Sequence, residues 1–156
     1  MIPRVLFKLI LPLACKWAKE QERIILRDGV ALTASQTEDA RKIGVQEAER
    51  VRLRVVDKIP MVKNTLLRAA AEQTGLISPF TIGLTLRHGI FIRADHWGER
   101  RLVIHELAHT AQYERLGGFK GFLSAYLDEC LTVGYPNGPL EQEAKRWEAE
   151  ILGPSS

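Results

Sequence analysis

The sequence HELAH occupies residues 105–109, inside a segment whose apolar pattern predicts a helix that ends at Gly117. Two histidines four positions apart project from the same side of a helix, separated by roughly 40° of rotation. Their imidazole nitrogens can therefore reach one metal ion, and the glutamate between them lies beside a water on that ion. We expect His105 and His109 to be metal ligands and Glu106 to be a general base.

The remainder of the predicted helix has one apolar side and one polar side. Four residues fall within about 100° of arc and form a stripe that can pack on a sheet or on another helix: Ile104, Leu107, Ala108 and Ala111. The polar side carries His105, Glu106, His109 and Tyr113. This division predicts a central helix whose second side lines a cleft.

Length and composition predict one domain covering residues 1–156. The chain is 46% hydrophobic and 26% charged, which is typical of a soluble globular protein. Its formal charge is +3, without a basic run interleaved with aromatic residues, so we expect no nucleic-acid partner. Cys15 and Cys130 form neither a Cys-x-x-Cys pair nor a disulfide framework, and we expect a reduced compartment, the cytoplasm.

Residues 1–24 form a separate N-terminal segment, with a helix predicted over residues 4–24. The first fifteen residues, MIPRVLFKLILPLAC, weakly resemble an export or lipoprotein leader. Lys8 interrupts the apolar run, Pro12 stands where a cleavage box requires an aliphatic residue, and the run is too short to span a bilayer. We expect a packed or interfacial helix with peripheral membrane contact as one option. Membrane association or export remains the alternative, and the oligomeric state is open.

Turn and periodicity signals divide the rest of the chain into helices and a few strands. The expected elements are a helix capped by Thr33 or Ser35 and ending near Gly44, a strand at 51–56, a helix at 62–74, strands at 80–86 and 90–92 around a His88-Gly89 turn, a helix at 119–131, and a last helix that begins at Pro139. These elements predict an α+β domain, mostly helical, with a small antiparallel sheet or hairpin beside the HELAH helix.

The chain resembles the HExxH zincin metallopeptidases, and among them the gluzincin branch and small uncharacterised bacterial metallopeptidases. The resemblance rests on HELAHTAQYERLGG at residues 105–118 and GYPNGPLEQEA at 134–144, and more loosely on residues 80–150. It implies a zincin-like fold with a third ligand from a glutamate in an E-x-x-A pattern on a later helix. Glu141 fits this pattern, because Ala144 follows it by three positions.

The choice of the third ligand stays open between Glu141 and Glu143. The two residues are two apart, so they point in directions about 160° from one another and only one can face the histidines. Both are also acceptable as solvated first-turn acids favoured by the helix dipole. In gluzincins an aspartate often follows the alanine, whereas Lys145 stands here.

Two imidazoles and one carboxylate suit Zn²⁺ with a fourth position left for water, which is typical of a catalytic site. Zinc lowers the pKa of its bound water to about 7 and polarises a substrate carbonyl. Glu106 would take a proton from the water and pass it to the leaving amine. The sequence therefore predicts a zinc-dependent hydrolase, a peptidase acting on a peptide or protein substrate.

Several supporting residues are less well defined by the sequence. The candidates for stabilising the oxyanion are Tyr113, Tyr126 and Tyr135. We expect His88 and His96 to be exposed turn histidines. The hairpin Thr81–Ala94 could offer an edge to an extended peptide, in which case proline at Ile90 or Ile92 would abolish cleavage.

Two other functions remain compatible with the motif. A non-catalytic zincin scaffold could bind or regulate a partner through Arg52, Arg54 and the N-terminal helix. A zinc amidase of the deformylase type would require an upstream cysteine ligand, and Cys15 lies far from the motif in sequence. The glutamate at position 106 favours an enzyme, because a site that only held metal would not require it.

Overall fold

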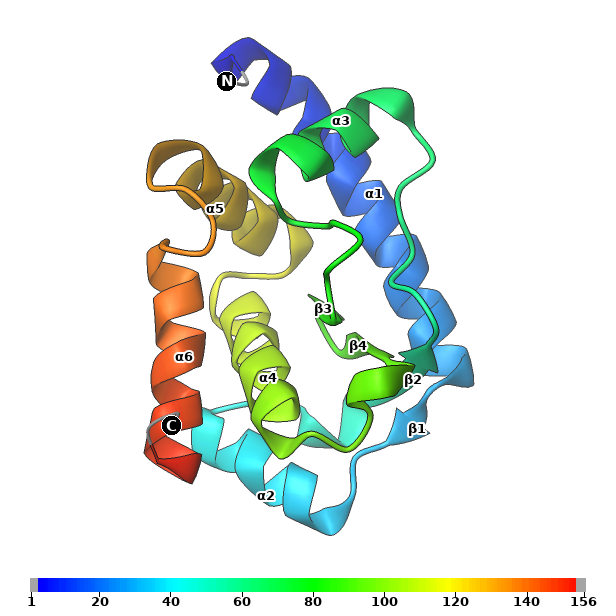
Figure 1. The fold of residues 1–156 in the computed structure, drawn as a ribbon, viewed down its shortest axis with the longest axis vertical. Helices are drawn as coiled ribbons and strands as arrows, with labels where there is room; N and C mark the ends of the chain where they lie inside the picture. Colours follow the sequence, from blue (N-terminus) through cyan, green and yellow to red (C-terminus); the bar gives the residue numbers. More distant parts are fainter. Residues whose placement is uncertain (1–2, 154–156) are drawn as a thin grey trace.

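The computed structural model describes residues 3–153 and confirms the α+β class (Figure 1). The helices within this range are α1 (Arg4–Asp28), α2 (Ala34–Ile43), α3 (Thr65–Thr74), α4 (Arg100–Arg115), α5 (Phe119–Thr132) and α6 (Pro139–Leu152). The strands are β1 (Val30–Ala31), β2 (Arg52–Val56), β3 (Gly83–Leu86) and β4 (Gly89–Arg93). Two short 3₁₀ helices, Ala48–Arg50 and Ala94–His96, complete the secondary structure of these residues.

The four strands form one mixed sheet in the order β1-β2-β4-β3. The β3–β4 hairpin is antiparallel, as expected, but β2 lies parallel to β4 with Leu53 opposite Ile90. The expected hairpin is therefore present, but the expectation that the sheet as a whole is antiparallel was wrong, because the sheet is mixed. Parallel neighbouring strands must be joined by a long crossover connection. The segment between β2 and β3, which contains α3, provides the length for this crossover.

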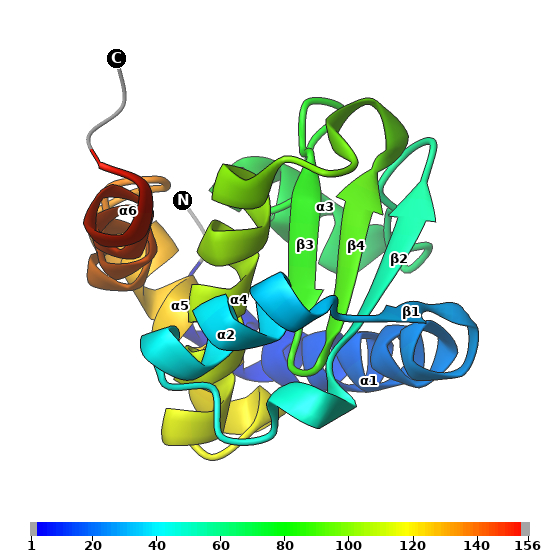
Figure 2. The same cartoon turned by 90° about the horizontal axis from the view of Figure 1, so that it is seen from below.

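Helices cover both faces of the sheet (Figure 2). Leu53, Ile90 and Ile92 belong to a buried cluster that also contains the apolar stripe of α4 and residues of α2 and α6. Phe91 and Leu84 belong to a second cluster, with residues of α1 and α5. β4 is therefore central and buried on both faces, and α4 packs beside the edge strand β3.

Proline at Ile90 or Ile92 would therefore not test peptide binding. Both residues are fully buried in β4, which pairs with β2 on one side and β3 on the other. Proline there would remove a backbone donor and disrupt the core. The edge strand beside α4 is β3.

Local capping signals set most helix ends. Thr33 caps α2, because its hydroxyl accepts from the backbone N–H of Gln36 at 3.1 Å. The helix expected at 62–74 begins later, at Thr65, because the side chain of Asn64 accepts from the N–H of Leu67 at 3.0 Å. The strand expected from residue 80 likewise begins only at Gly83.

The hairpin turn consists of Arg87 and His88, not of His88 and Gly89. Arg87 has a φ of 62°, and Gly89 is already the first residue of β4. A Cβ at Gly89 would lie 3.0 Å from the Cβ of Ile25, so α1 packs directly on this backbone. His88 is buried rather than exposed, because the turn folds under α1, whereas His96 is partly exposed.

The N-terminal helix α1 is a packed helix over most of its length. Ile10, Ala18 and Ile25 are buried, while Val5 and Leu9 in its first turns are exposed. Met1 and Ile2, at the start of the predicted N-terminal segment, lie outside the described residues. Between residues 3 and 153, every helix is too short or too polar to cross a membrane.

Candidate metal centre

The HELAH helix α4 and the last helix α6 lie side by side and bring three predicted residues together (Figure 1). Nε2 of His105 lies 3.0 Å from Oε1 of Glu141, and Nε2 of His109 lies 2.7 Å from Oε2 of the same carboxylate. One ligand atom from each residue falls within 4.8 Å of the other two. Ligands about 2.1 Å from a tetrahedral zinc ion lie roughly 3.4 Å apart, so the group could hold a metal ion.

The second glutamate of the pair, Glu143, has a different environment. Its Oε1 accepts from Nε2 of Gln112 at 2.6 Å and from Arg115 at 3.0 Å. The two carboxylates diverge around α6, as the helical geometry requires, and Ala144 is buried against the α4 core. The structure thus brings Glu141 to the histidines and leaves Glu143 at the rim of the α4–α6 contact.

Each imidazole is oriented by a partner at its Nδ1. For His105 this is Oε2 of Glu148 at 2.6 Å, and for His109 it is Oε1 of Gln112 at 2.8 Å. The amide NH₂ of Gln112 donates to the carbonyl of Leu140 and to Glu143, so its oxygen is left to accept from His109. Both Nδ1 atoms therefore carry the proton, and both Nε2 atoms face Glu141, the arrangement that metal-ligating histidines adopt.

Glu148 and Gln112 were not among the residues predicted from the sequence. Glu148 supplies the carboxylate that the gluzincin pattern led us to seek at the position of Lys145, which is exposed. The signal was present, because Glu148 follows Glu141 by seven residues and so shares its face of the helix after two turns. Gln112 follows His109 by three residues, which also places the two side chains on one face.

The electrostatics of the site favour a positive charge between the histidines and Glu141. Burial lowers the pKa of His105, but hydrogen bonds with Glu141 and Glu148 outweigh it and raise the pKa to about 10. The pKa of His109 is raised in the same way, with burial opposed by Glu141. Burial raises the pKa of Glu141, and the two histidines then lower it well below its usual range. Protons on Nε2 supply this charge without metal, and a divalent ion would replace them.

The metal-free protein should lose stability as the pH rises from about 6.5 towards about 10. The folded-state pKa of His105, about 10, lies above its value of 6.5 in the unfolded chain, so its stabilising contribution is complete below pH 6.5 and lost above pH 10. Thermal unfolding of metal-free protein at pH 6.5 and 9.5 measures this. Saturating zinc should remove most of the difference, because the ion replaces the protons. An equal midpoint at both pH values without zinc would contradict the assignment.

Glu106 directly follows His105 in sequence and faces β3 from α4. Its charge contributes to the raised pKa of both imidazoles. The hydroxyl of Thr85 donates to Oε1 of Glu106 at 2.8 Å. A Cβ at Gly83 would come within 3.2 Å of the Glu106 side chain, so glycine lets β3 approach this close. Glu106 is therefore buried and fixed in orientation.

The three tyrosines considered for the oxyanion have three different roles. The hydroxyl of Tyr113 donates to the carbonyl of Thr85 at 3.3 Å, and its ring stacks on Phe122. The hydroxyl of Tyr126 donates to Oε2 of Glu141 at 2.8 Å and so supports a candidate ligand. Tyr135 alone among them borders the open cleft. Burial, and then the charge of Glu141, raise its pKa to about 12, so the phenol keeps its proton.

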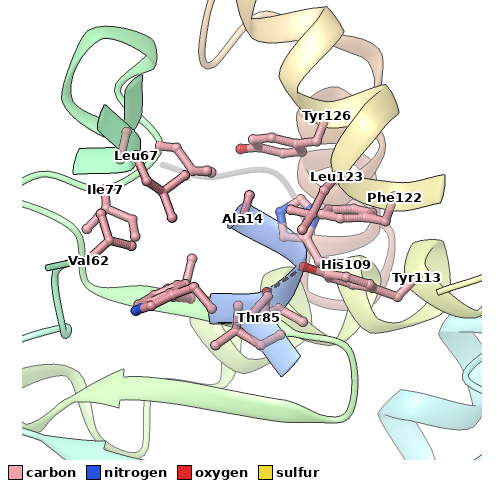
Figure 3. Close-up of a pocket in the computed structure, with 16 residues that line it drawn as sticks. Ala14, Val62, Leu67, Ile77, Thr85, His109, Tyr113, Phe122, Leu123 and Tyr126 are labelled. Carbon is pink, nitrogen blue, oxygen red and sulfur yellow. Dashed lines mark hydrogen bonds between the residues drawn. The ribbon is translucent and has the colours of Figure 1, made fainter. Parts of the chain in front are cut away.

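Two cavities border the site. An open cleft of about 700 Å³ reaches His105 and Glu141 and is lined by both charged and apolar residues of α4, α6 and the 135–136 loop. A smaller cavity of about 70 Å³ reaches His109 from inside (Figure 3). Its walls are almost entirely apolar and come from α1, α3, α5 and β3, including Ala14, Leu67 and Leu123.

Comparison with known proteins gave no match to a family model, to a curated protein or to a solved structure.

Proposed function

We propose that the protein is a zinc-dependent hydrolase that cleaves peptide bonds. One observation carries the proposal: His105, His109 and Glu141 converge with both Nε2 atoms turned inward, while Glu106, the residue after His105 on α4, is buried and held by Thr85 of β3. Two imidazoles and a carboxylate leave a coordination position for water or substrate, which distinguishes a catalytic zinc site from a structural one. A polypeptide that only needed a structural ion would not require a buried glutamate in this place.

Zinc bound by these three residues would lower the pKa of a water molecule and polarise the substrate carbonyl. Glu106 would accept the proton of that water on its carboxylate and donate it to the departing amine nitrogen. Thr85 holds Oε1 of Glu106, which leaves Oε2 as the atom that carries the proton. Tyr135, protonated and at the cleft, would donate a hydrogen bond to the developing oxyanion.

The two cavities suggest which peptides the protein would cleave. A substrate backbone would lie in the open cleft, which already exposes His105 and Glu141. The apolar cavity beside His109 would take one aliphatic or aromatic side chain, because its walls offer few polar partners. We therefore expect cleavage next to an apolar residue.

A mixture of defined peptides tests this function. Zinc-loaded protein should cleave at bonds flanked by an apolar side chain, and mass spectrometry of the products identifies the bonds. Treatment with a chelator should stop cleavage, and added zinc should restore it. A zinc-loaded, folded protein that leaves every peptide intact would favour the alternative, a binding or regulatory domain that keeps the metal group.

The cytoplasmic location is also a proposal. Cys15 and Cys130 are both free, as a reducing compartment would keep them.

A further inference from the structure

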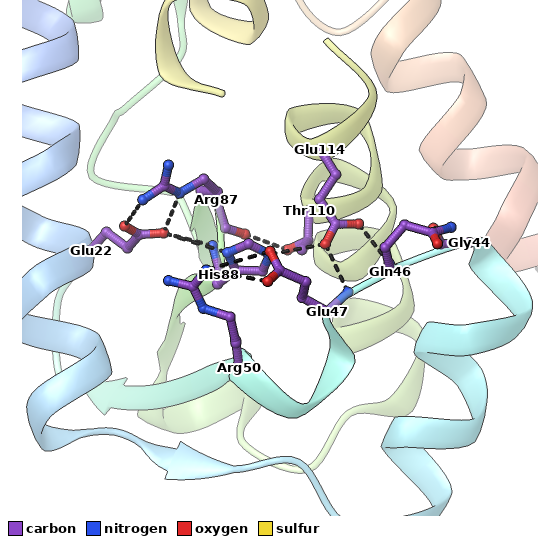
Figure 4. A network of polar contacts seen from close by, with 9 residues as sticks. All are labelled: Glu22, Gly44, Gln46, Glu47, Arg50, Arg87, His88, Thr110 and Glu114. Carbon is purple, nitrogen blue, oxygen red and sulfur yellow. Dashed lines mark hydrogen bonds and ion pairs between the residues drawn. The ribbon is translucent and has the colours of Figure 1, made fainter. Parts of the chain in front are cut away.

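A second cluster of metal-ligating side chains surrounds His88, which no step above uses (Figure 4). Nε2 of His88 lies 2.9 Å from Oε2 of Glu114 and 3.7 Å from Oε2 of Glu47. One ligand atom from each of the three lies within 4.8 Å of the others. Glu114 follows His109 by five residues on α4, so it points about 140° away from it around the helix. The cluster is thus separate from the first site.

The members of this cluster are held in place by the surrounding backbone. The carboxylate of Glu114 accepts from the backbone N–H of Gln46 at 2.7 Å and of Glu47 at 3.0 Å. On the other side of the turn, Glu22 accepts from the guanidinium of Arg87 at 2.8 Å and from the N–H of His88 at 3.0 Å. The imidazole and one carboxylate are therefore preorganised.

The imidazole of His88 lies between negative charges at both of its nitrogens. Its side chain is only 3% exposed, and among the described residues Nδ1 has no hydrogen-bond partner. Oε2 of Glu22 lies 3.9 Å from Nδ1. A proton on Nε2 alone would leave the Nδ1 lone pair facing Glu22. A proton on Nδ1 alone would leave the Nε2 lone pair facing Glu114.

A cation at Nε2 removes this conflict. The proton then lies on Nδ1, on the side of the Glu22 carboxylate, whose Oε2 is 3.9 Å away and beyond direct hydrogen-bond distance. Glu47 is about half exposed, so an ion can enter from solvent along its side chain. To bind the ion, Glu47 must leave its ion pair with Arg50, in which Nη1 lies 3.4 Å from Oε1. This pair is weak because both side chains are exposed.

We propose that His88, Glu47 and Glu114 bind a second divalent metal ion, independent of the His105–His109–Glu141 group. One imidazole and two carboxylates suit Zn²⁺, the ion used as the probe below. The ligands come from the hairpin turn, from the segment that precedes β2 and from the end of α4. The ion would hold these three parts of the chain together.

Zinc titration of the full chain, followed by calorimetry and metal analysis, tests the proposal. Wild-type protein should bind about two zinc ions per chain if both groups are occupied. Glu47→Gln and His88→Gln should each remove one ion. Glu49→Gln is the matched control, because Glu49 is an exposed neighbour outside the cluster, and it should bind as wild type does. Since the first group lies elsewhere, its retained ion shows that each variant has folded.

The design separates this proposal from the proposed function. If the His105–His109–Glu141 group bound no zinc, wild-type protein would bind one ion. Glu47→Gln would lose this ion and His105→Ala would keep it, and the proposal of the second site would be supported. Unchanged binding in both Glu47→Gln and His88→Gln would overturn it. Nitrogen-15 spectra of the zinc-saturated protein give a second readout: His88 should carry a proton on Nδ1 only. Protons on both ring nitrogens would mean a buried imidazolium and would also overturn it.

Discussion

Replacing Glu106 with glutamine should lower kcat for peptide hydrolysis by about 10²–10⁴-fold while zinc content stays unchanged. Glutamine has the size of glutamate and can still accept from the hydroxyl of Thr85, so the site should keep its shape. Its amide cannot take a proton from the metal-bound water, and the proton transfer to the leaving amine is lost with it. Steady-state kinetics on a cleaved peptide, with metal analysis of the same sample, measures both effects.

The matched control for this variant is Glu150→Gln. Glu150 is an exposed glutamate of α6, so the same change of charge should leave kcat as in wild type. Turnover retained in Glu106→Gln would remove Glu106 as the base. Loss of zinc together with turnover would instead show that Glu106 helps to build the metal group.

Replacing Glu141 with alanine should weaken zinc binding at the first group by more than about 100-fold. Loss of an outer hydrogen-bonding partner typically costs 10–100-fold in metal affinity, and Glu141 is proposed as a direct ligand. The variant also leaves the Tyr126 hydroxyl and both Nε2 atoms without their shared partner. We therefore expect a lower unfolding midpoint for the metal-free variant as well, and equilibrium dialysis against zinc measures the affinity.

Glu143→Ala is the comparison that decides between the two glutamates. Glu143 contacts Gln112 and Arg115, not the inward Nε2 atoms, so its loss should reduce zinc affinity far less than the loss of Glu141. Zinc retained in Glu141→Ala and lost in Glu143→Ala would reverse the assignment. Wild-type protein that takes up no zinc would remove the proposed metal chemistry altogether.

The burial of His88 and His96 could not be predicted from their neighbours in sequence. From the sequence, His88 and His96 were both predicted to be exposed turn histidines. The structure buries the first under α1 and leaves the second partly exposed. Only the path of α1, which depends on contacts more than sixty residues apart in sequence, separates the two.

The sequence by itself determined what depends on neighbours along the chain. The spacing of HELAH placed His105, Glu106 and His109 together on α4, because helical geometry repeats every 3.6 residues. Thr33 and Pro139 marked the starts of α2 and α6. Proximity within one helix is a property of residue separation alone. For the same reason, the apolar stripe of α4 was correctly assigned to the core.

Only the tertiary structure decided what depends on how α6 is rotated against α4. That rotation turns Glu141 and Glu148 towards the histidines and leaves Glu143 with Arg115. Glu148, and not the residue at position 145, therefore supplies the carboxylate that orients His105. The rotation follows from packing of Leu140 and Ala144 into the core, and packing is a sum of many weak contacts between distant segments that no short pattern encodes.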